Sequence, residues 1–406
     1  MTAPVPNDRL RRIDAARQGM LADGRSLALS GNDSGLESWI TRSWQRCLAN
    51  GQRPGDRLAF DAISKEAVRR VIEASHPLVQ AARPVLGQLA HAMAHTRYFA
   101  ILTNADGIVV DVNGPLDRDD RRASLITRLG VDLSERAVGT TAIGAALGEK
   151  RSVWLHRGEH FFADTSMYSC AGAPVFGPNG QCVGMLDLTG IDVPERPELR
   201  HLVSQCAQRI ENALLGQVQA ALVVRLRWSG DLLGSLSSPP SAADSGFQPS
   251  ETDGLISVDS DGHVIGSNSA AREMLPPLAN LMAAEARQAH QVHCSDLFAM
   301  PWENLFDAAT LGRSALEVPL WSGLRLQALP LAPASPDRAA AAVPLRQGLN
   351  QGLLQGRGAS LRDVEIALIR KAVDQAKGNV ADAARALGIS RATVYRKLAS
   401  QPSANR

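Results

Sequence analysis

The residues best suited to metal or acid–base chemistry lie together at 156–160, in the stretch HRGEH. His156, Glu159 and His160 have the spacing H-x-x-E-H, which on a helix sets two imidazoles one turn apart to bind zinc beside a general base. The preceding stretch SVWLH has the pattern of a strand, and Gly158 interrupts any helix. We therefore expect a loop here, and we expect the protein to carry no cofactor and to be no enzyme.

A second set of side chains, suited to DNA, lies in GNVADAARALGISRATVYRKL at 378–398. An arginine can pair with guanine O6 and N7, and a threonine can contact thymine or a phosphate. A lysine holds phosphates and sets the position of the protein without reading sequence. The candidate DNA-contacting residues are Asn379, Ser390, Arg391, Ala392, Thr393, Tyr395, Arg396 and Lys397.

Three short helices are expected to position these side chains. Apolar residues keep helical spacing over 361–376, Gly378 ends that helix, and Asn379 and Ser390 can cap the next two. The tight turn at 387–389 between them predicts a helix-turn-helix, whose second helix enters the major groove. The last 46 residues carry nine Lys and Arg against four Asp and Glu, whereas the whole chain is only +2. A helical hairpin with a solvated basic face is the alternative.

Ahead of this module, the sequence predicts sheets with helices packed on them. Strand patterns separated by turn residues occur at 98–103, 108–112, 152–156, 171–176 and 181–190, and a helix pattern follows at 199–215. Strands between helical ends indicate an α+β domain. ILTNADGIVVDVN at 101–113 aligns without gaps to ISVDSDGHVIGSN at 256–268. This repeat indicates either two related sheets in series or a chance likeness between Asp-Gly hairpins.

The composition suggests how these parts are divided. The segments 235–254 and 331–360 are rich in Ser, Pro, Gly, Ala or Gln, which is typical of linkers. The expected organisation is a helical region at 1–97, a sensor domain at 98–220, a connector at 221–254, a second domain at 255–330, a linker at 331–360 and the DNA-binding domain at 361–401.

Overall composition excludes several classes of protein. The chain has 406 residues with 43 Lys and Arg against 41 Asp and Glu, so it is not a uniformly basic nucleic-acid coat. Its five scattered cysteines contain no CxxC pair, which argues against a disulfide framework or a cysteine-rich zinc site. We find no apolar run typical of a signal peptide or a membrane span. The expected location is the cytoplasm, without membrane contact.

Several stretches resemble one family of transcriptional regulators. The sequence at 378–398 is similar to the Fis-type helix-turn-helix that ends sigma-54-dependent activators. The acetoin-catabolism type of these regulators resembles this chain in ESWITRSWQRC (37–47), VGTTAIGAAL (138–147), GEHFF (158–162) and SCAGAPVFGPNGQCVGMLDLTG (169–190). The resemblance covers most of the chain. It implies a GAF sensor domain followed by a PAS-like domain, both α+β, and then a small all-α Fis-type domain.

The GAF resemblance implies a pocket for a small molecule between sheet and helices. Such a pocket needs a few polar groups among apolar strands. The candidate ligand-binding residues are Thr140, Thr141, His156, His160, Phe161, Tyr168, Cys170 and Asp187. The alternative is that these polar groups are satisfied core or rim residues.

We expect no metal in this pocket, but two further alternatives involve Cys170. Some related sensors hold iron. In this chain, the four side chains that would bind it are His156, Glu159, His160 and Cys170. Cys170 alone is a candidate sensor of electrophiles, although a buried structural thiol is the commoner case.

The sequence departs from the family in one respect. Such activators carry a central ATPase domain, whereas here a bare linker stands at 331–360, with neither a GxxxxGK[ST] phosphate loop nor a GAFTGA motif in the chain. We therefore expect a sequence-specific DNA-binding transcriptional regulator that responds to a small-molecule effector through its GAF domain. Without ATPase activity, it is not expected to remodel sigma-54 complexes.

The resemblance also suggests partners. A homodimer is expected to bind half-sites about one helical turn apart, roughly 34 Å, and RNA polymerase is a further candidate partner. Acetoin or other small carbonyls and alcohols are effectors that the family suggests. The alternative is a regulatory partner that heterodimerises with, or competes against, a full-length ATPase-containing activator.

Overall fold

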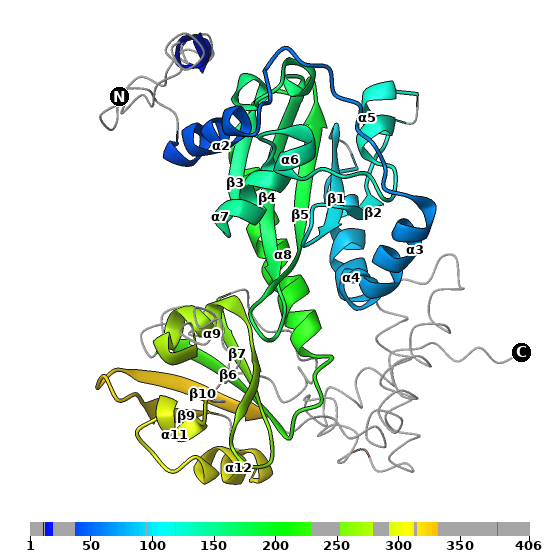
Figure 1. The fold of residues 1–406 in the computed structure, drawn as a ribbon. Coiled ribbons are helices and arrows are strands. Elements are labelled where there is room, and N and C mark those ends of the chain that lie inside the picture. The colour runs from blue at the N-terminus through cyan, green and yellow to red at the C-terminus, as the bar shows by residue number, and fades with distance from the viewer. Residues whose placement is uncertain are drawn as a thin grey trace, which may run out of the picture. The chain divides into compact units, whose positions relative to one another are not determined.

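The computed structural model describes residues 11, 13–18, 37–94, 96–117, 119–228, 252–278, 292–311, 315–331 and 380. The chain divides into two compact units, Met1–Pro333 and Ala334–Arg406. The first unit holds two five-stranded antiparallel sheets with helices packed on them (Figure 1). The helix-turn-helix and its eight candidate DNA-contacting residues lie outside the described part of the chain. Among the residues that the structure describes, no helix combines the length and apolar character needed to cross a bilayer.

The first sheet has the strand order β2-β1-β5-β4-β3. Its strands are β1 (Tyr98–Asn104), β2 (Val109–Asn113), β3 (Val153–His156), β4 (Tyr168–Phe176) and β5 (Cys182–Ile191). All five predicted strands are therefore confirmed, and so is the predicted helix at 199–215. β4 begins three residues before its predicted start, because Tyr168 and Ser169 already pair with Ile191 and Gly190 of β5.

Two layers of helices cover the two faces of this sheet. Side chains alternate along a strand, so Ala100 and Leu102 of β1 pack with α4 and α8, whereas Phe99 and Ile101 pack with α2, α5, α6 and α7 (Figure 1). The helices are α2 (Ser38–Ala49), α3 (Lys65–Ala74), α4 (His76–Ala92), α5 (Arg121–Ile126), α6 (Glu135–Val138), α7 (Ala142–Glu149) and α8 (Leu199–Leu215). Two single 3-10 turns, η1 (Arg157–Glu159) and η2 (Ala163–Thr165), follow β3.

Charged and polar contacts join α2 to α6. Arg46 Nε and Nη2 donate to the two carboxylate oxygens of Glu135 at 2.6 and 2.9 Å, and Ser43 Oγ donates to the same carboxylate at 2.5 Å. Trp39 and Trp44, on the apolar side of α2, are almost fully buried. The stretch at 37–47 thus holds α2 on the sheet through both its apolar and its polar faces.

The second sheet has the order β8-β7-β6-β10-β9. Its strands are β6 (Leu222–Trp228), β7 (Gly254–Val258), β8 (Val264–Ser267), β9 (Leu316–Pro319) and β10 (Arg325–Leu331), and its helices are α9 (Ser269–Met274), α11 (Cys294–Leu297) and α12 (Glu303–Thr310). The prediction of a connector at 221–254 is wrong in its first part. Residues 222–228 form the central strand of this sheet, because Leu222, Val224 and Leu226 point to one face and fill its core, whereas the residues between them are more exposed.

The internal repeat corresponds to two equivalent edge hairpins, β1–β2 and β7–β8. The side chain of Asn104, and of Asp259 in the second hairpin, accepts hydrogen bonds from the amides two and four residues later, at 2.9–3.1 Å. Gly107 and Gly262 both have positive φ, 83° and 88°. The sequence likeness therefore reflects two sheets with similar hairpins. The strand that pairs with each hairpin has a different place in the chain. β5 follows its hairpin in the sequence, whereas β6 precedes its hairpin.

The C-terminal end of α8 makes hydrogen bonds to the start of α9, beside the second sheet. Glu211 accepts from the amides of Phe176 and Ser269, each at 3.0 Å, and Asn268 Nδ2 donates to Asn212 Oδ1 at 2.8 Å. Burial raises the pKa of Glu211. A buried carboxylate with two amide donors is costly to disrupt, since either donor would lose its partner.

Gly144 of α7 leaves no room for a side chain, so we predict that Gly144→Ala lowers the free energy of unfolding by about 1–3 kcal/mol. A Cβ at Gly144 would lie 2.7 Å from the backbone nitrogen of Glu135, whereas one at Gly148, in the same helix, has only Arg46 Nη2 near it, at 3.6 Å. Gly148→Ala is the matched control and should be neutral or stabilising by about 0.5–1 kcal/mol. Urea unfolding measures both, and equal effects would contradict the packing argument.

Candidate functional site

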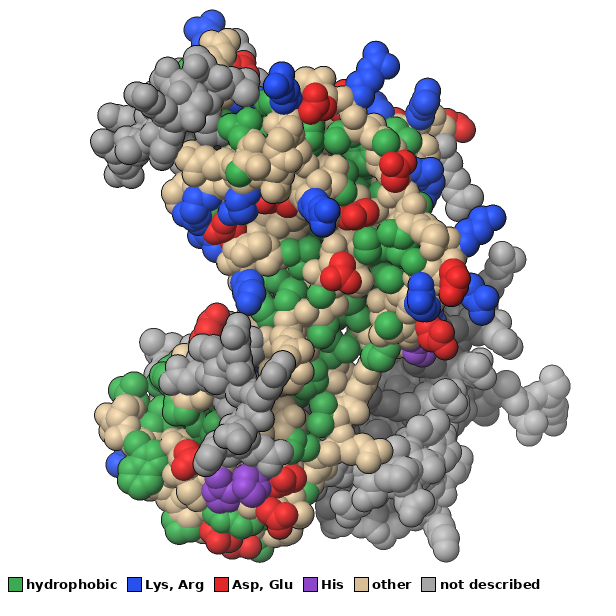
Figure 2. All heavy atoms as spheres, in the orientation of Figure 1, with side chains coloured by type: hydrophobic (Ala, Val, Ile, Leu, Met, Phe, Trp, Pro, Cys, Tyr) green, Lys and Arg blue, Asp and Glu red, His purple; other side chains and the backbone are tan. Residues whose placement is uncertain are grey.

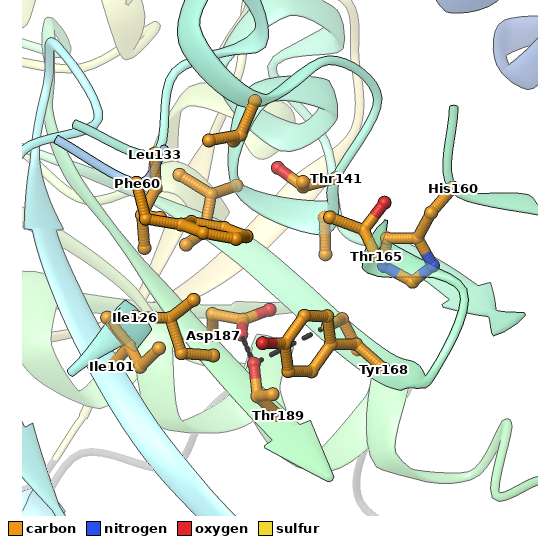
Figure 3. A pocket seen from close by; sticks show the side chains of 14 residues that line it. Phe60, Ile101, Ile126, Leu133, Thr141, His160, Thr165, Tyr168, Asp187 and Thr189 are labelled. Atoms are coloured by element: carbon orange, nitrogen blue, oxygen red, sulfur yellow. Dashed lines mark hydrogen bonds between the residues drawn. The ribbon is translucent and has the colours of Figure 1, made fainter. Parts of the chain in front are cut away.

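A pocket lies beside the first sheet, on the face covered by α5, α6 and α7. The space in and around the pocket, including the open solvent at its mouth, amounts to about 350 Å³. Its lining consists of Phe60, Ile101, Ile126, Leu133, Val138, Thr141, Ala142, Ile143, His160, Thr165, Tyr168, Cys170, Asp187 and Thr189 (Figure 3). Most of these side chains are apolar, and none is Lys or Arg.

Strand periodicity places the polar wall of the pocket. Tyr168 and Cys170 are two apart on β4, and Asp187 and Thr189 are two apart on β5, so each pair points to one face. Cys170 is directly opposite Thr189 in the ladder, and its Sγ lies 3.4 Å from Thr189 Oγ1. Ile101 of β1 lies opposite Asp187 from the other side. Three neighbouring strands therefore contribute to one wall.

Asp187 is fully buried in this wall. Thr189 Oγ1 donates a hydrogen bond to its Oδ2, but its Oδ1 has no partner (Figure 3). Burial, only partly offset by that hydrogen bond, raises the pKa of Asp187 to about 7. Near neutral pH the carboxyl group thus has both protonation states available, and Oδ1 can accept or donate a hydrogen bond.

His160 contributes a second buried polar atom without a partner. Its Nδ1 lies 2.9 Å from the carbonyl oxygen of Arg157. Because a carbonyl only accepts, Nδ1 carries the proton and Nε2 is left as an acceptor. Burial lowers the pKa of this imidazole to about 4, so it is neutral at physiological pH. Within the described ranges of the chain, no protein group hydrogen-bonds to Nε2.

The other polar groups of the lining already have partners. Tyr168 Oη donates to the carbonyl of Arg122 at 3.1 Å, and Thr165 Oγ1 donates to that of Phe162 at 2.9 Å. Thr141 Oγ1 accepts from the amide of Gly144 and caps α7. His160 Nε2 and Asp187 Oδ1 are therefore the polar atoms of the lining that remain for a bound molecule. In Figure 3, His160 and Thr165 lie on one side of the cavity, and Phe60 and Leu133 on the other.

The structure brings together five of the eight residues proposed from the sequence: Thr141, His160, Tyr168, Cys170 and Asp187. All five belong to the lining.

The other three proposed residues do not line the pocket. Thr140 Oγ1 lies 2.7 Å from Ser43 Oγ, on the side of α2. His156 Nδ1 lies 2.7 Å from Ser169 Oγ, and Phe161 packs in the core with its ring against Phe162. These three side chains therefore contact other parts of the protein and not the pocket.

Three lining residues with polar or aromatic side chains were missed. Thr189 was predictable, because it follows Asp187 by two along a strand and so shares its face. Phe60 and Thr165 come from irregular segments, where no periodicity indicates the direction of a side chain.

The sequence predicted that the H-x-x-E-H stretch is not an α-helix, and the structure agrees. His156 ends β3, and residues 157–159 form the 3-10 turn η1, where Glu159 Oε2 accepts from the amide of His156 at 2.7 Å. In the part of the chain that the structure describes, no three His, Cys, Asp or Glu side chains are placed to hold a metal ion. Burial raises the pKa of Cys170, which keeps its thiol protonated and argues against a reactive sensor of electrophiles.

Comparisons with known proteins bear on both ends of the chain. Residues 14–212 match the family described as "MimR, N-terminal domain", and residues 360–400 match "Bacterial regulatory protein, Fis family". The chain is thus similar to the MimR family over residues 14–212 and to the Fis family over residues 360–400. The predicted resemblance to acetoin-type activators is confirmed.

Curated relatives are named transcriptional regulators. The acetoin catabolism regulatory protein of Cupriavidus necator is 27% identical over 58% of this chain and 34% of its own length. The propane 2-monooxygenase operon transcriptional activator MimR of Mycolicibacterium smegmatis is 30% identical over 52% of this chain and 34% of its own length. The chain spans about a third to a half of the length of the first curated relatives it matches.

Among solved structures, the E. coli DhaR(N)-DhaL complex contains a similar chain. The match covers 73% of this chain and all of that one, with a TM-score of 0.42 and 13% sequence identity.

We predict that Asp187→Asn makes stability less dependent on pH. A folded-state pKa near 7 against an ordinary value of 3.8 means that the folded protein binds the proton more tightly. The resulting stability is complete below pH 3.8 and is lost as pH rises to 7, at about 1.4 kcal/mol per unit. From pH 5 to pH 8, the wild type should therefore lose about 2–3 kcal/mol relative to the variant.

Urea unfolding of both proteins across this pH range measures the difference. His160, whose pKa is lowered, contributes the opposite slope below pH 6.5, but it does so in both proteins and cancels. Asp106→Asn, at an exposed turn of the β1–β2 hairpin, is the control and should give no such trend. A constant difference between wild type and Asp187→Asn would contradict the assignment.

Proposed function

We propose that the protein is a sequence-specific DNA-binding transcriptional regulator that responds to a small-molecule effector. In this proposal the first sheet and its helices form a GAF-type sensor domain, the second sheet a PAS-like domain, and residues 361–401 a Fis-type helix-turn-helix. The observation that carries the proposal is the match of residues 360–400 to the Fis family. The names of the relatives, which are operon activators, support it.

The distribution of charge supports DNA binding by the C-terminal region. On the face shown in Figure 2, Lys and Arg side chains are interspersed with Asp and Glu side chains over the described elements. The last 46 residues, by contrast, carry nine basic and four acidic side chains. Phosphate binding needs such a local surplus of positive charge. In this proposal Arg391 reads a base and Lys397 contacts a phosphate.

The pocket supports effector binding. A lining without Lys or Arg offers nothing to neutralise a carboxylate or a phosphate, so the proposed effector is uncharged. Because His160 Nε2 only accepts, the effector must supply at least one hydrogen-bond donor. The modest volume and the apolar lining fit a molecule of few carbon atoms.

The proposed mode of action excludes ATP-driven remodelling. In the sequence that separates the second sheet from the Fis-type region, the chain contains no GxxxxGK[ST] phosphate loop. The regulator would then act by occupying its operator as a homodimer, with half-sites about one helical turn apart, or by contacting RNA polymerase from there.

Fluorescence anisotropy on DNA from the gene's own upstream region, at two salt concentrations, tests this proposal. Arg391→Ala should weaken specific binding by about 1–3 kcal/mol and leave binding to random DNA almost unchanged. Lys397→Ala is the matched control, because it also removes one positive charge but should weaken all sequences alike and reduce the salt slope by about one.

Three other outcomes would change the proposal. Equal losses on both DNAs in the two variants would contradict base reading by Arg391. Binding without sequence preference, unaffected by Arg391→Ala, would indicate an operator elsewhere. No binding at low salt would favour a partner that heterodimerises with a full-length activator.

A further inference from the structure

The loop that carries His160 is held by side chains from the N-terminal end of the chain. Its carbonyl oxygens at Gly158 and Phe161 accept from the guanidinium of Arg17, the first at 3.2 Å. The carbonyl oxygen between them, at Glu159, accepts from Trp44 Nε1 at 2.9 Å. Arg17 also lies over the ring of Trp44, 5.9 Å from its centroid. Two side chains thus bind three carbonyl groups of one turn.

The segment around Arg17 lies directly on this turn. Residues 13–18 are helical, and Ile13 is 1% exposed as part of the core on the pocket side of the sheet. A Cβ at Gly158 would lie 3.2 Å from Ile13 Cγ2, which shows how closely the Ile13 side chain approaches the backbone of the turn. Glycine at this position therefore lets the segment sit against the loop.

Arg17 is an unusual choice for a purely structural contact. Burial lowers its pKa, so its charge is partly removed from water. An apolar side chain would avoid this desolvation, but it would leave the carbonyl groups at 158 and 161 without their donor. What the guanidinium adds is direction, since its planar donors bind two carbonyl groups in one fixed geometry.

We propose that Arg17, together with Trp44, is a positioning residue of the ligand pocket, and that residues 13–18 are a strap that closes the turn carrying His160 over the pocket. This inference rests on the pocket being the effector site of the proposed function. Holding the carbonyl groups at 158, 159 and 161 fixes the backbone of His160, and so fixes the direction of its Nε2. By linkage, a ligand bound to Nε2 stabilises the strap as much as the strap stabilises the bound ligand.

The cysteines provide a test that needs neither DNA nor an effector. Cys170 lines the pocket, whereas Cys206 belongs to the core on the opposite face of the sheet and Cys294 to the second sheet. The full-length protein is treated with methyl methanethiosulfonate, and the rate at each cysteine is followed by peptide mass spectrometry. Local opening of the strap should expose Cys170 and leave Cys206 and Cys294 protected.

We expect Arg17→Ala to raise the rate at Cys170 at least tenfold and to leave those at Cys206 and Cys294 unchanged. Arg11→Ala removes the same charge from an exposed position of the same segment and should change none of the three rates. Trp44→Phe keeps an aromatic ring but removes the donor to Glu159, so it should also raise the rate at Cys170. If Arg17→Ala does not fold, Trp44→Phe provides the test.

A second measurement separates positioning from general loosening. Hydrogen–deuterium exchange at the imidazole C2 gives the pKa of each histidine, and that of His160 should move from about 4 toward 6.5 in Arg17→Ala. Arg17→Lys, which keeps a donor, should restore part of the wild-type value. An unchanged rate at Cys170, or an equal rise at all three cysteines, would overturn the proposal. Neither measurement depends on DNA binding, which the anisotropy experiment tests separately.

Discussion

The pairing of β4 with β5 is the constraint on which the candidate site depends. Cys170 lies opposite Thr189, and Gly172 lies opposite Asp187. A shift of one residue in either strand would turn the polar side chains toward α4 and α8 and bring Leu186 or Leu188 to the pocket. Gly172 helps to hold this register: a Cβ there would lie 2.0 Å from Met185 Cε and 3.0 Å from the carbonyl oxygen of Ala142. Only glycine lets α7 and the sheet approach closely enough to enclose the cavity.

Two buried polar atoms without partners in one cavity carry the argument from fold to function. Leaving a buried polar atom unsatisfied costs about 1–3 kcal/mol, so a domain that only had to fold would gain by replacing both groups. Asp187 and His160 also depart from their ordinary pKa values in opposite directions, since burial disfavours the charged form of each. Near pH 7, His160 is thus neutral and Asp187 is only partly ionised. A neutral ligand with a hydrogen-bond donor would supply the hydrogen bond that these buried atoms lack.

Much of the fold could be predicted from the sequence, because it depends on periodicity. The strands of the first sheet and the helix α8 show clear apolar patterns with turn residues between them. β6 was missed because the apolar Val223 interrupts its alternation and because the Ser- and Pro-rich stretch after it dominated the composition. The errors in the site have another cause. Thr140 and Phe161 are direct neighbours of lining residues, and in turns a shift of one position reverses the direction of a side chain in a way that no repeat reveals.

β4 connects the two halves of the first unit physically. Near its start, Tyr168 and Cys170 line the pocket, and at its end the amide of Phe176 donates to Glu211. Glu211 accepts in turn from the amide of Ser269, which begins α9 of the second sheet. A ligand changes a distant site only through states that differ in their affinity for it. The proposed strap would supply such a difference at the turn 157–161, whose carbonyl groups bind side chains of a separate segment and whose imidazole lines the cavity. The strand beside it is joined to α9 of the second sheet through the buried carboxylate of Glu211, next to the hydrogen bond between Asn212 and Asn268, so one strand carries both the pocket wall and a contact to the second sheet.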